Sequence, residues 1–180
     1  MIEARLTLSK STRLVVLGVT TVVILALVNT QIAGKERIVR DGATVLLALA
    51  PVDPRSLMQG DYMALRYALA GDVAEAADAA EVADGEIVIE LDESGVARFV
   101  ALHDGQPLAS GQHLLQFRVR GETVRLASDA FYFEEGQVET YARARFGELR
   151  VDTGGSAVLI GLRDQNVEPI EESRLPIAPR

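Results

Sequence analysis

The chain has 180 residues, of which 48% are hydrophobic, so it can form one domain with an apolar core but not two ordinary domains or a large barrel enzyme. It contains no cysteine, which excludes disulfide scaffolds and thiolate chemistry, including cysteine zinc sites. The net charge is −8. Because nucleic-acid binding depends on basic side chains that displace cations from phosphates, we expect no nucleic-acid partner.

An apolar segment near the N-terminus predicts a transmembrane helix over residues 14–30, preceded by a cytoplasmic tail of residues 1–13. Between residues 12 and 30, Arg13 is the only charged side chain. A helix of that length extends about 28 Å, close to the thickness of a bilayer's hydrocarbon core. A cleaved signal peptide and a buried soluble helix are the alternatives. Neither 26–28 nor 31–33 fits the small-residue pattern of a cleavage site well, so the sequence favours an uncleaved, single-span anchor.

The orientation of this anchor is less strongly encoded, because basic residues flank it equally on both sides. They are Arg5, Lys10 and Arg13 before it, and Lys35, Arg37 and Arg40 after it. The positive-inside rule therefore gives a tie. Lys10 and Arg13 lie closer to the helix end, and every acid except Glu3 follows the helix. We expect a protein of the inner (cytoplasmic) membrane, with its domain outside the cytoplasm.

The residues after the anchor predict a mainly β (α+β) fold, in which an antiparallel β-rich domain over residues 31–165 carries one amphipathic helix. A polar tail follows over 166–180. Short apolar or alternating segments are separated by Gly, Asp and Pro, as in strands joined by turns. The continuous apolar run at 44–50 predicts a buried strand that ends at Pro51, and the alternation at 62–69 predicts a half-buried strand.

Further along the chain, the alanine-rich and acidic segment 71–85 predicts a solvated helix or a loose insertion, and not a site. Three hairpins follow from paired strand patterns: 86–92 with 96–103, 113–120 with 123–127, and 148–151 with 157–162. Between the last two hairpins, 134–146 predicts the amphipathic helix that packs on the sheet. Its apolar residues recur at three and four spacings, and Gly147 can end it.

The middle hairpin places arginines on one face. Only Gly121 and Glu122 separate its strands, which is the pattern of a type II′ turn and sets Arg118 opposite Arg125. Like charges in such a pair destabilise a sheet unless an acid or a partner neutralises them. Arg118, Arg120 and Arg125 are therefore candidates for contacts with a partner, with the domain's own acidic segment or with a small anionic ligand. The alternative is that the guanidinium groups simply extend into water or meet surface acids.

Two sequence blocks carry a resemblance to a known family. Residues 60–67 read GDYMALRY, which fits the pattern GDYxxLxY, and residues 131–152 read FYFEEGQVETYARARFGELRVD, followed by a glycine-rich turn and VLIGLRD. From Val45 to Asp164 the chain resembles the GDYXXLXY family of bacterial proteins. The resemblance implies a membrane-anchored protein and assigns no reaction to it.

Turn and core chemistry account for the motif without a ligand. Gly60 suits a tight turn, Asp61 can accept hydrogen bonds from turn amides, and Leu65 and Tyr67 share a strand face with Met63. We therefore interpret Gly60, Asp61, Tyr62, Leu65 and Tyr67 mainly as determinants of the fold. If the motif has a further function, the residues to probe are Asp53, Arg55, Asp61 and Tyr62.

No complete catalytic or metal-binding set emerges from the sequence, so we predict no catalytic residue, metal or cofactor. Ser56 lacks the lysine base that activates the nucleophile of membrane-anchored signal peptidases. His103, Asp104 and His113 offer only two imidazoles at loose spacing, whereas zinc sites take three or four ligands, so a turn role is favoured. The acid pair Glu134 and Glu135 fits a helix start better than glycoside chemistry.

The expected function is therefore that of a non-catalytic, membrane-anchored envelope domain, an interaction or accessory subunit that binds another membrane or envelope protein. The alternative is an envelope hydrolase in which Asp53 and Asp61 act with Tyr62 or a histidine. The two hypotheses differ in whether these acids converge in a pocket or satisfy turn amides.

Overall fold

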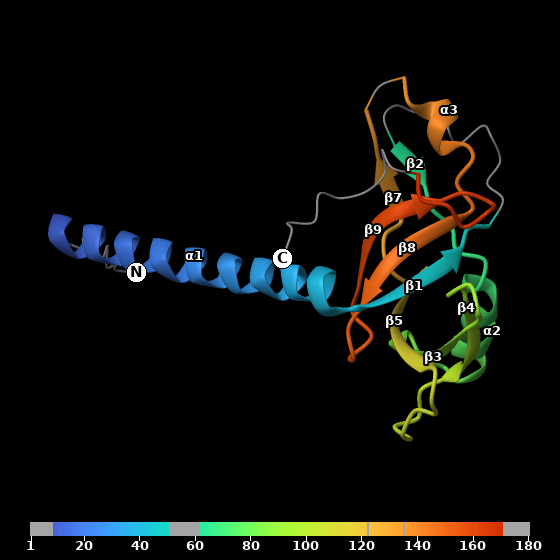
Figure 1. Cartoon of the computed structure of the whole chain (residues 1–180). Coiled ribbons are helices and arrows are strands. Elements are labelled where there is room, and N and C mark those ends of the chain that lie inside the picture. Colours follow the sequence, from blue (N-terminus) through green and yellow to red (C-terminus); the bar gives the residue numbers. More distant parts are fainter. Residues whose placement is uncertain (1–8, 51–61, 122, 135, 171–180) are drawn as a thin grey trace. The chain divides into compact units, whose positions relative to one another are not determined.

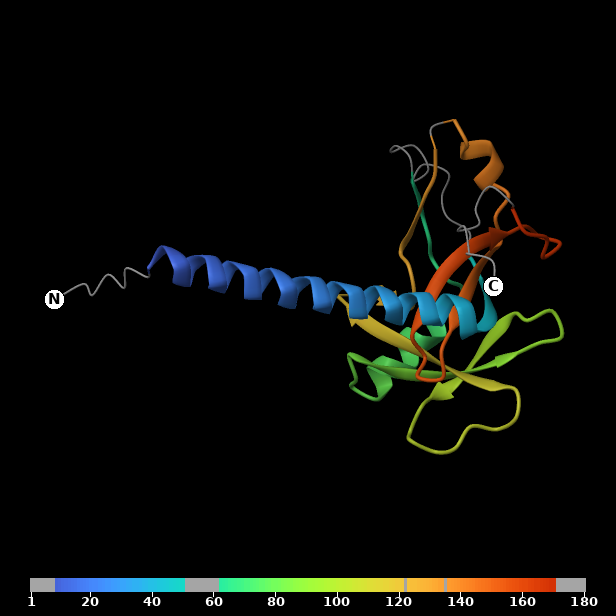
Figure 2. The same ribbon diagram turned by 60° about the vertical axis from the view of Figure 1, so that its left-hand side comes forward.

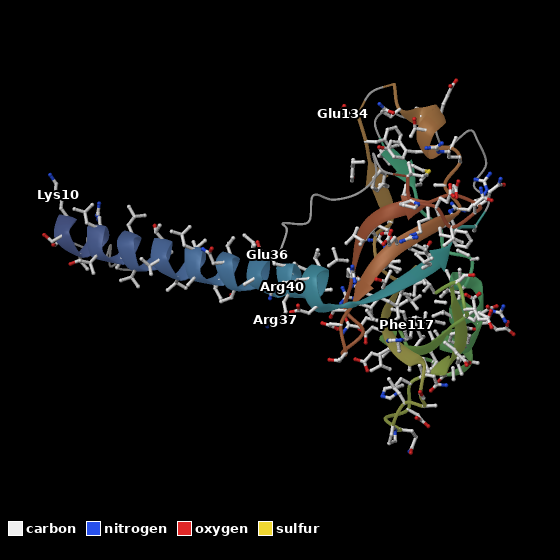
Figure 3. The ribbon with its side chains drawn as sticks, in the orientation of Figure 1. Lys10, Glu36, Arg37, Arg40, Phe117 and Glu134 are labelled. Carbon is white, nitrogen blue, oxygen red and sulfur yellow. The ribbon has the colours of Figure 1, made fainter. Side chains whose placement is uncertain are left out.

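The computed structural model describes residues 9–50, 62–121, 123–134 and 136–170, and the chain divides into two compact units after Glu36. Helix α1 spans Lys10–Asp41, so it continues well beyond the predicted end at Thr30 (Figure 1). Over most of its length its side chains project outward (Figure 3), and none of its most apolar stretch is buried, whereas Ile38 near its C-terminal end is buried. One helix in the described part of the chain is thus long and apolar enough to cross a membrane.

Three polar side chains within α1, those of Thr21, Asn29 and Thr30, donate hydrogen bonds to carbonyls of the helix itself. The Thr21 hydroxyl donates to the Leu17 carbonyl at 2.9 Å, and the Asn29 amide donates to the Leu25 carbonyl at 2.8 Å. Such bonds back to the preceding turn cover groups that an apolar environment would otherwise leave without partners. These polar side chains therefore add little to the cost of placing the helix in an apolar environment.

The second unit, from Arg37 onward, contains three antiparallel sheets among its described residues. One sheet has the order β1 (Ala43–Ala48), β8 (Phe146–Val151), β9 (Ala157–Arg163). A two-stranded ribbon pairs β2 (Tyr62–Ala64) with β7 (Ala130–Tyr132). The third sheet has the order β4 (Ala97–Leu102), β3 (Asp84–Leu91), β5 (Gln112–Arg120), β6 (Thr123–Arg125). The mainly β (α+β) class predicted from the sequence is confirmed.

The two larger sheets share one hydrophobic core. Leu47 from β1 and Leu149 from β8 belong to the same buried cluster as Ile87 from β3 and Leu115 from β5. In Figure 2 the orange and red strands β8 and β9 lie next to the green and yellow strands β3 to β5. At about 1.5 to 3 kcal/mol for each fully buried large aliphatic side chain, this core supplies most of the gross stabilisation of the domain.

All three predicted hairpins are present, and the apolar run at 44–50 forms β1 with consecutive buried residues, as expected for a strand covered on both faces. The segment 71–85 forms helix α2 (Ala70–Ala79) and the start of β3. The helix is not merely solvated, because Val73 and Ala77 are buried against the sheet.

The alternation predicted at 62–69 is confirmed, although the strand is shorter than expected. Met63, Leu65, Tyr67 and Leu69 are all buried. β2 nevertheless ends at Ala64. The Leu65 amide still donates to the Asp129 carbonyl beside β7, but the chain then changes partners: the Arg66 carbonyl accepts from the Ala50 amide, and the Ala68 amide donates to the Ala48 carbonyl at the end of β1.

The predicted helix over 134–146 is wrong in extent. Helix α3 covers only Val138–Tyr141, and Phe146 already belongs to β8. The apolar residues do not form one buried stripe, since Tyr141 is buried while Val138 is exposed. Tyr141 packs against Phe131 and Phe133, with ring centroids 5.3 and 4.7 Å apart, and this cluster fixes the single turn. Gly147 does not cap a helix but lies in β8.

Candidate functional site

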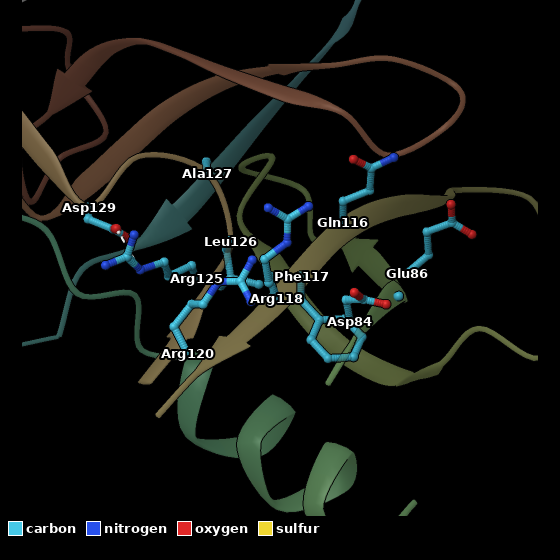
Figure 4. Close-up of a pocket in the computed structure, with 11 residues that line it drawn as sticks. Asp84, Glu86, Gln116, Phe117, Arg118, Arg120, Arg125, Leu126, Ala127 and Asp129 are labelled. Atoms are coloured by element: carbon cyan, nitrogen blue, oxygen red, sulfur yellow. Dashed lines mark ion pairs between the residues drawn. The ribbon is translucent and has the colours of Figure 1, made fainter. Parts of the chain in front are cut away.

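A hollow of about 560 Å³ lies on the outer face of the four-stranded sheet (Figure 4). The charged residues that line it are Asp84, Glu86, Arg118, Arg120, Arg125 and Asp129. The hollow is open to solvent, and all three arginines predicted as interaction candidates lie in it. The middle hairpin brings them together.

The arginines lie on this face because β5 alternates between core and solvent. Phe117 is 4% exposed on the core side, whereas Arg118 and Arg120 are exposed on the other side. The predicted register is confirmed, with Arg118 opposite Arg125 and Val119 opposite Val124. Gly121 has a φ of +59°, as the first central position of a type II′ turn requires.

Acidic residues flank the arginine pair on both sides. Arg125 Nε lies 3.1 Å from Asp129 Oδ2, and on the other side Asp84 of β3 stands opposite Arg118 in the strand register. These two acids reduce the repulsion that the sequence predicted for Arg118 and Arg125. Among the residues that the structure describes, neither Arg118 nor Arg120 has an acidic partner within 4 Å.

The rim of the hollow at Gln116 is held by the turn of the β8–β9 hairpin. The Gln116 backbone amide donates to the Gly155 carbonyl at 2.9 Å, and its side-chain amide donates to the Gly154 carbonyl at 3.0 Å. The turn itself is organised by Asp152 Oδ1, which accepts hydrogen bonds from the Gly154 and Ser156 amides. The hollow therefore has a fixed backbone frame.

The motif residues divide between the core and the surface. Leu65 and Tyr67 are buried, and the Tyr67 hydroxyl donates to the Ser128 carbonyl at 3.0 Å. Burial raises the pKa of this phenol well above its usual range. Tyr62, in contrast, is 37% exposed. The remaining residues singled out in this region, Asp53, Arg55, Ser56, Gly60 and Asp61, lie outside the described residues.

Tyr62 pairs with a residue that sequence reasoning did not single out. It stands directly opposite Tyr132 in the β2–β7 ribbon, with ring centroids 5.7 Å apart, and Tyr132 is 75% exposed. Tyr62 belongs to the first sequence block and Tyr132 to the second. The only signal for this contact was the presence of both blocks in one chain.

The two histidines considered as metal ligands, His103 and His113, lie on different strands of the four-stranded sheet or next to them. His113 pairs with Ile89 within β5 and β3, whereas His103 follows β4 and donates its backbone amide to the Glu86 carbonyl. Asp104 accepts a hydrogen bond from the Gln106 amide at 3.1 Å, which is the turn role that its sequence context predicts. In the described parts of the chain, no group of three or more potential ligands is placed to hold a metal ion.

Comparison with known proteins gives one match. A family model described as GDYXXLXY protein matches residues 24–162, a range that includes the blocks 60–67 and 131–152 and, among the described strands, β1 to β8 and β9 as far as Leu162. No curated protein and no solved structure matches the chain. With most of its length matched by the model, the chain belongs to the GDYXXLXY family.

Proposed function

We propose that this protein is a non-catalytic, membrane-anchored domain of the bacterial envelope that binds another membrane or envelope protein. The observation that carries this proposal is the exposed tyrosine pair, Tyr62 and Tyr132, on the narrow ribbon where the two family blocks meet. Tyrosine is enriched in protein interfaces because its ring offers a large apolar area and its hydroxyl a hydrogen bond.

The energetics favour burial of this pair by a partner. An aromatic ring left in water retains an unfavourable hydration cost of about 25 cal/mol per Å² of apolar surface, which a partner recovers on binding. The two rings already contact each other, so little side-chain freedom remains to be lost. A pre-ordered aromatic pair of this kind is a typical anchor of an interface.

Site-specific crosslinking in intact cells tests the proposal. A photoreactive phenylalanine analogue at Tyr132, or at Tyr62, is expected to yield a crosslinked product with a membrane-fraction protein. The same analogue at Val100, an exposed residue of β4, serves as the matched control and is expected to yield none. Equal crosslinking from all three positions, or none from either tyrosine, would refute the proposal.

The proposal includes an inner-membrane anchor with the domain outside the cytoplasm. The apolar helix α1 supports the anchor, and the two basic residues next to the start of its apolar run, Lys10 and Arg13, support a cytoplasmic N-terminus. Protease added to spheroplasts is then expected to digest the domain while a cytoplasmic marker survives. Protection of the domain until the cells are lysed would reverse the topology.

A further inference from the structure

We infer that the hollow between β3, β5 and β6 binds an extended protein segment that carries acidic residues at alternate positions. This inference rests on the proposed function in one respect, namely that the ligand belongs to a protein partner. It adds the place and the chemistry of recognition. Arg118 and Arg120 are the side chains that hold the carboxylates, and Arg125 supports them from the neighbouring strand.

The charge of the hollow differs from that of the chain around it. The protein has a net charge of −8, yet three arginines from β5 and β6 converge on one open depression. Three acids, Asp84, Glu86 and Asp129, line the same hollow, so its positive charge is concentrated on the side of β5 and β6, where Asp129 faces three arginines. An anionic group is therefore attracted to that side of the hollow, within the screening distance of about 8 to 10 Å in physiological salt.

The three arginines differ in whether an acid of the described chain already pairs with them. Arg125 is engaged by Asp129 at 3.1 Å, whereas Arg118 and Arg120 form no ion pair with an acid in the described parts of the chain. Figure 4 shows the side chains of Arg118 and Arg120 between the Arg125–Asp129 pair and the acids of β3. A guanidinium group binds a carboxylate through two parallel hydrogen bonds, so Arg118 and Arg120 can each bind one carboxylate in this bidentate way.

The spacing of the two arginines selects an extended ligand. Arg118 and Arg120 are two residues apart on one strand and face the same side, which separates their Cα atoms by about 6.5 Å. Acidic side chains at alternate positions of an extended peptide have the same separation. A segment with the pattern acid–any–acid can therefore occupy both guanidinium groups without bending.

The acids of β3 limit what the hollow accepts. Asp84 stands opposite Arg118 and Glu86 opposite Gln116, so two carboxylates line the side of the hollow away from β6. They repel a compact, highly charged anion more strongly than singly charged carboxylates that are spread along a chain. This arrangement favours a peptide over polyphosphate or an anionic lipid surface.

Fluorescence anisotropy with the full-length protein in detergent micelles tests the inference. The probe is a fluorescein-labelled octapeptide with glutamate at alternate positions and serine between them, and a glutamine version is its control. We expect the double variant Arg118→Gln/Arg120→Gln to lower the affinity for the glutamate peptide by about tenfold or more, because two charge-assisted hydrogen-bonding forks are lost.

Two further variants separate binding in the hollow from non-specific attraction. Arg98→Gln removes one positive charge, half of that lost in the double variant, from an exposed arginine of β4 outside the hollow, and is expected to leave the affinity within about twofold of the original. Asp84→Asn/Glu86→Gln is expected to raise the affinity several-fold. A gain of this kind cannot result from partial unfolding.

The inference is overturned if the glutamine peptide binds as well as the glutamate peptide, or if Arg98→Gln weakens binding as much as the double variant. It is also overturned if tripolyphosphate, or vesicles of phosphatidylglycerol, bind the hollow more tightly than the peptide. Crosslinking from Tyr132 with no peptide binding would refute this inference and leave the proposed function standing. Peptide binding without crosslinking from either tyrosine would refute the proposed role of the tyrosine pair and leave the acidic-peptide site in the hollow standing.

Discussion

Two tyrosines of the same motif have opposite environments. Tyr67 is 5% exposed and donates its hydroxyl to the Ser128 carbonyl, whereas Tyr62 lies at the surface against Tyr132. The difference follows from strand alternation, because an odd number of positions separates the two residues and they point to opposite faces. The motif thus combines a residue that stabilises the core with one that remains available for contact.

Tyr67 provides a graded test of the core. Tyr67→Phe keeps the ring but removes the hydroxyl donor from the Ser128 carbonyl, which should reduce the free energy of unfolding by about 1 kcal/mol. Tyr67→Ala also leaves a cavity and should cost about 3 to 5 kcal/mol. Denaturant titration of the protein in micelles measures both losses. Equal stability of the wild type and the alanine variant would show that Tyr67 is not a core residue.

The same side chain predicts sensitivity to alkaline pH. Burial raises the pKa of Tyr67 in the folded state, so the neutral phenol is favoured there, while in the unfolded chain it ionises near pH 10. The stability contributed by this group is complete below about pH 10 and falls as the pH rises further, because the unfolded state then loses the proton first. Denaturant titrations between pH 8 and 11 should show that the free energy of unfolding declines more steeply with pH for the wild type than for Tyr67→Phe. Parallel curves would contradict this assignment.

At the scale of elements, local patterns predicted local structure. The hairpin at 113–127 was predicted down to its register because Gly121 and a two-residue turn determine which residues face each other. The helix over 134–146 was predicted from a 3.6-residue period that the aromatic cluster around Tyr141 interrupts. A period in the sequence cannot reveal a tertiary contact that stops the helix after one turn.

The candidate site was predictable only in part, because sequence patterns indicate local contacts but not contacts between distant segments. The arginines lie within one hairpin, so their common face follows from the sequence. Asp84 reaches Arg118 through pairing of β3 with β5, and Tyr132 reaches Tyr62 through pairing of β7 with β2. Both pairings join distant segments whose register depends on the packing of the whole domain. Neither contact has a local signature.

The docking of the β8–β9 turn on β5 yields a prediction with a matched control. Gly155 has a φ of +78°, and a Cβ there would lie 3.1 Å from the backbone nitrogens of Leu115 and Gln116. Gly111 has a φ of +84° with no atom near its Cβ position. Gly155→Ala should therefore destabilise the domain by about 2 to 4 kcal/mol, and Gly111→Ala by about 1 kcal/mol, since only the first adds a clash to the backbone strain. Similar losses in thermal or denaturant unfolding would show that the turn is not tightly docked.

At the scale of the whole molecule, helix α1 is the element that bears on association with a membrane. In α1, the polar side chains of Thr21, Asn29 and Thr30 all donate to carbonyls of the preceding turn, and apolar side chains project on every side. A helix that is apolar all round is expected inside a bilayer or a large core, and none of the most apolar stretch of α1 is buried among the residues that the structure describes.

We therefore expect the full-length protein to sediment with membranes and to remain there during extraction with alkaline carbonate, because α1 is long and apolar enough to cross the bilayer, which would bury its exposed apolar side chains. Immunoblotting of the pellet and the supernatant measures this partition, and a peripheral membrane protein serves as the control for extraction. Recovery of a soluble form whose sequence starts near residue 30 would instead demonstrate cleavage.

The way in which the four-stranded sheet ends beyond β5 also bears on how the domain behaves when many copies are close together. A free strand edge offers unpaired amides and carbonyls to any neighbouring chain and so invites aggregation. Here β6 pairs with residues 118–120 of β5, and the Gln116 amide donates a hydrogen bond to the Gly155 carbonyl. The side of β5 away from β3 is therefore covered from Gln116 to Arg120. β6 itself is only three residues long and ends in a charged arginine. On this side of the sheet, copies of the domain held close together therefore meet along β6, whose short length and charged end limit the pairing of strands between copies.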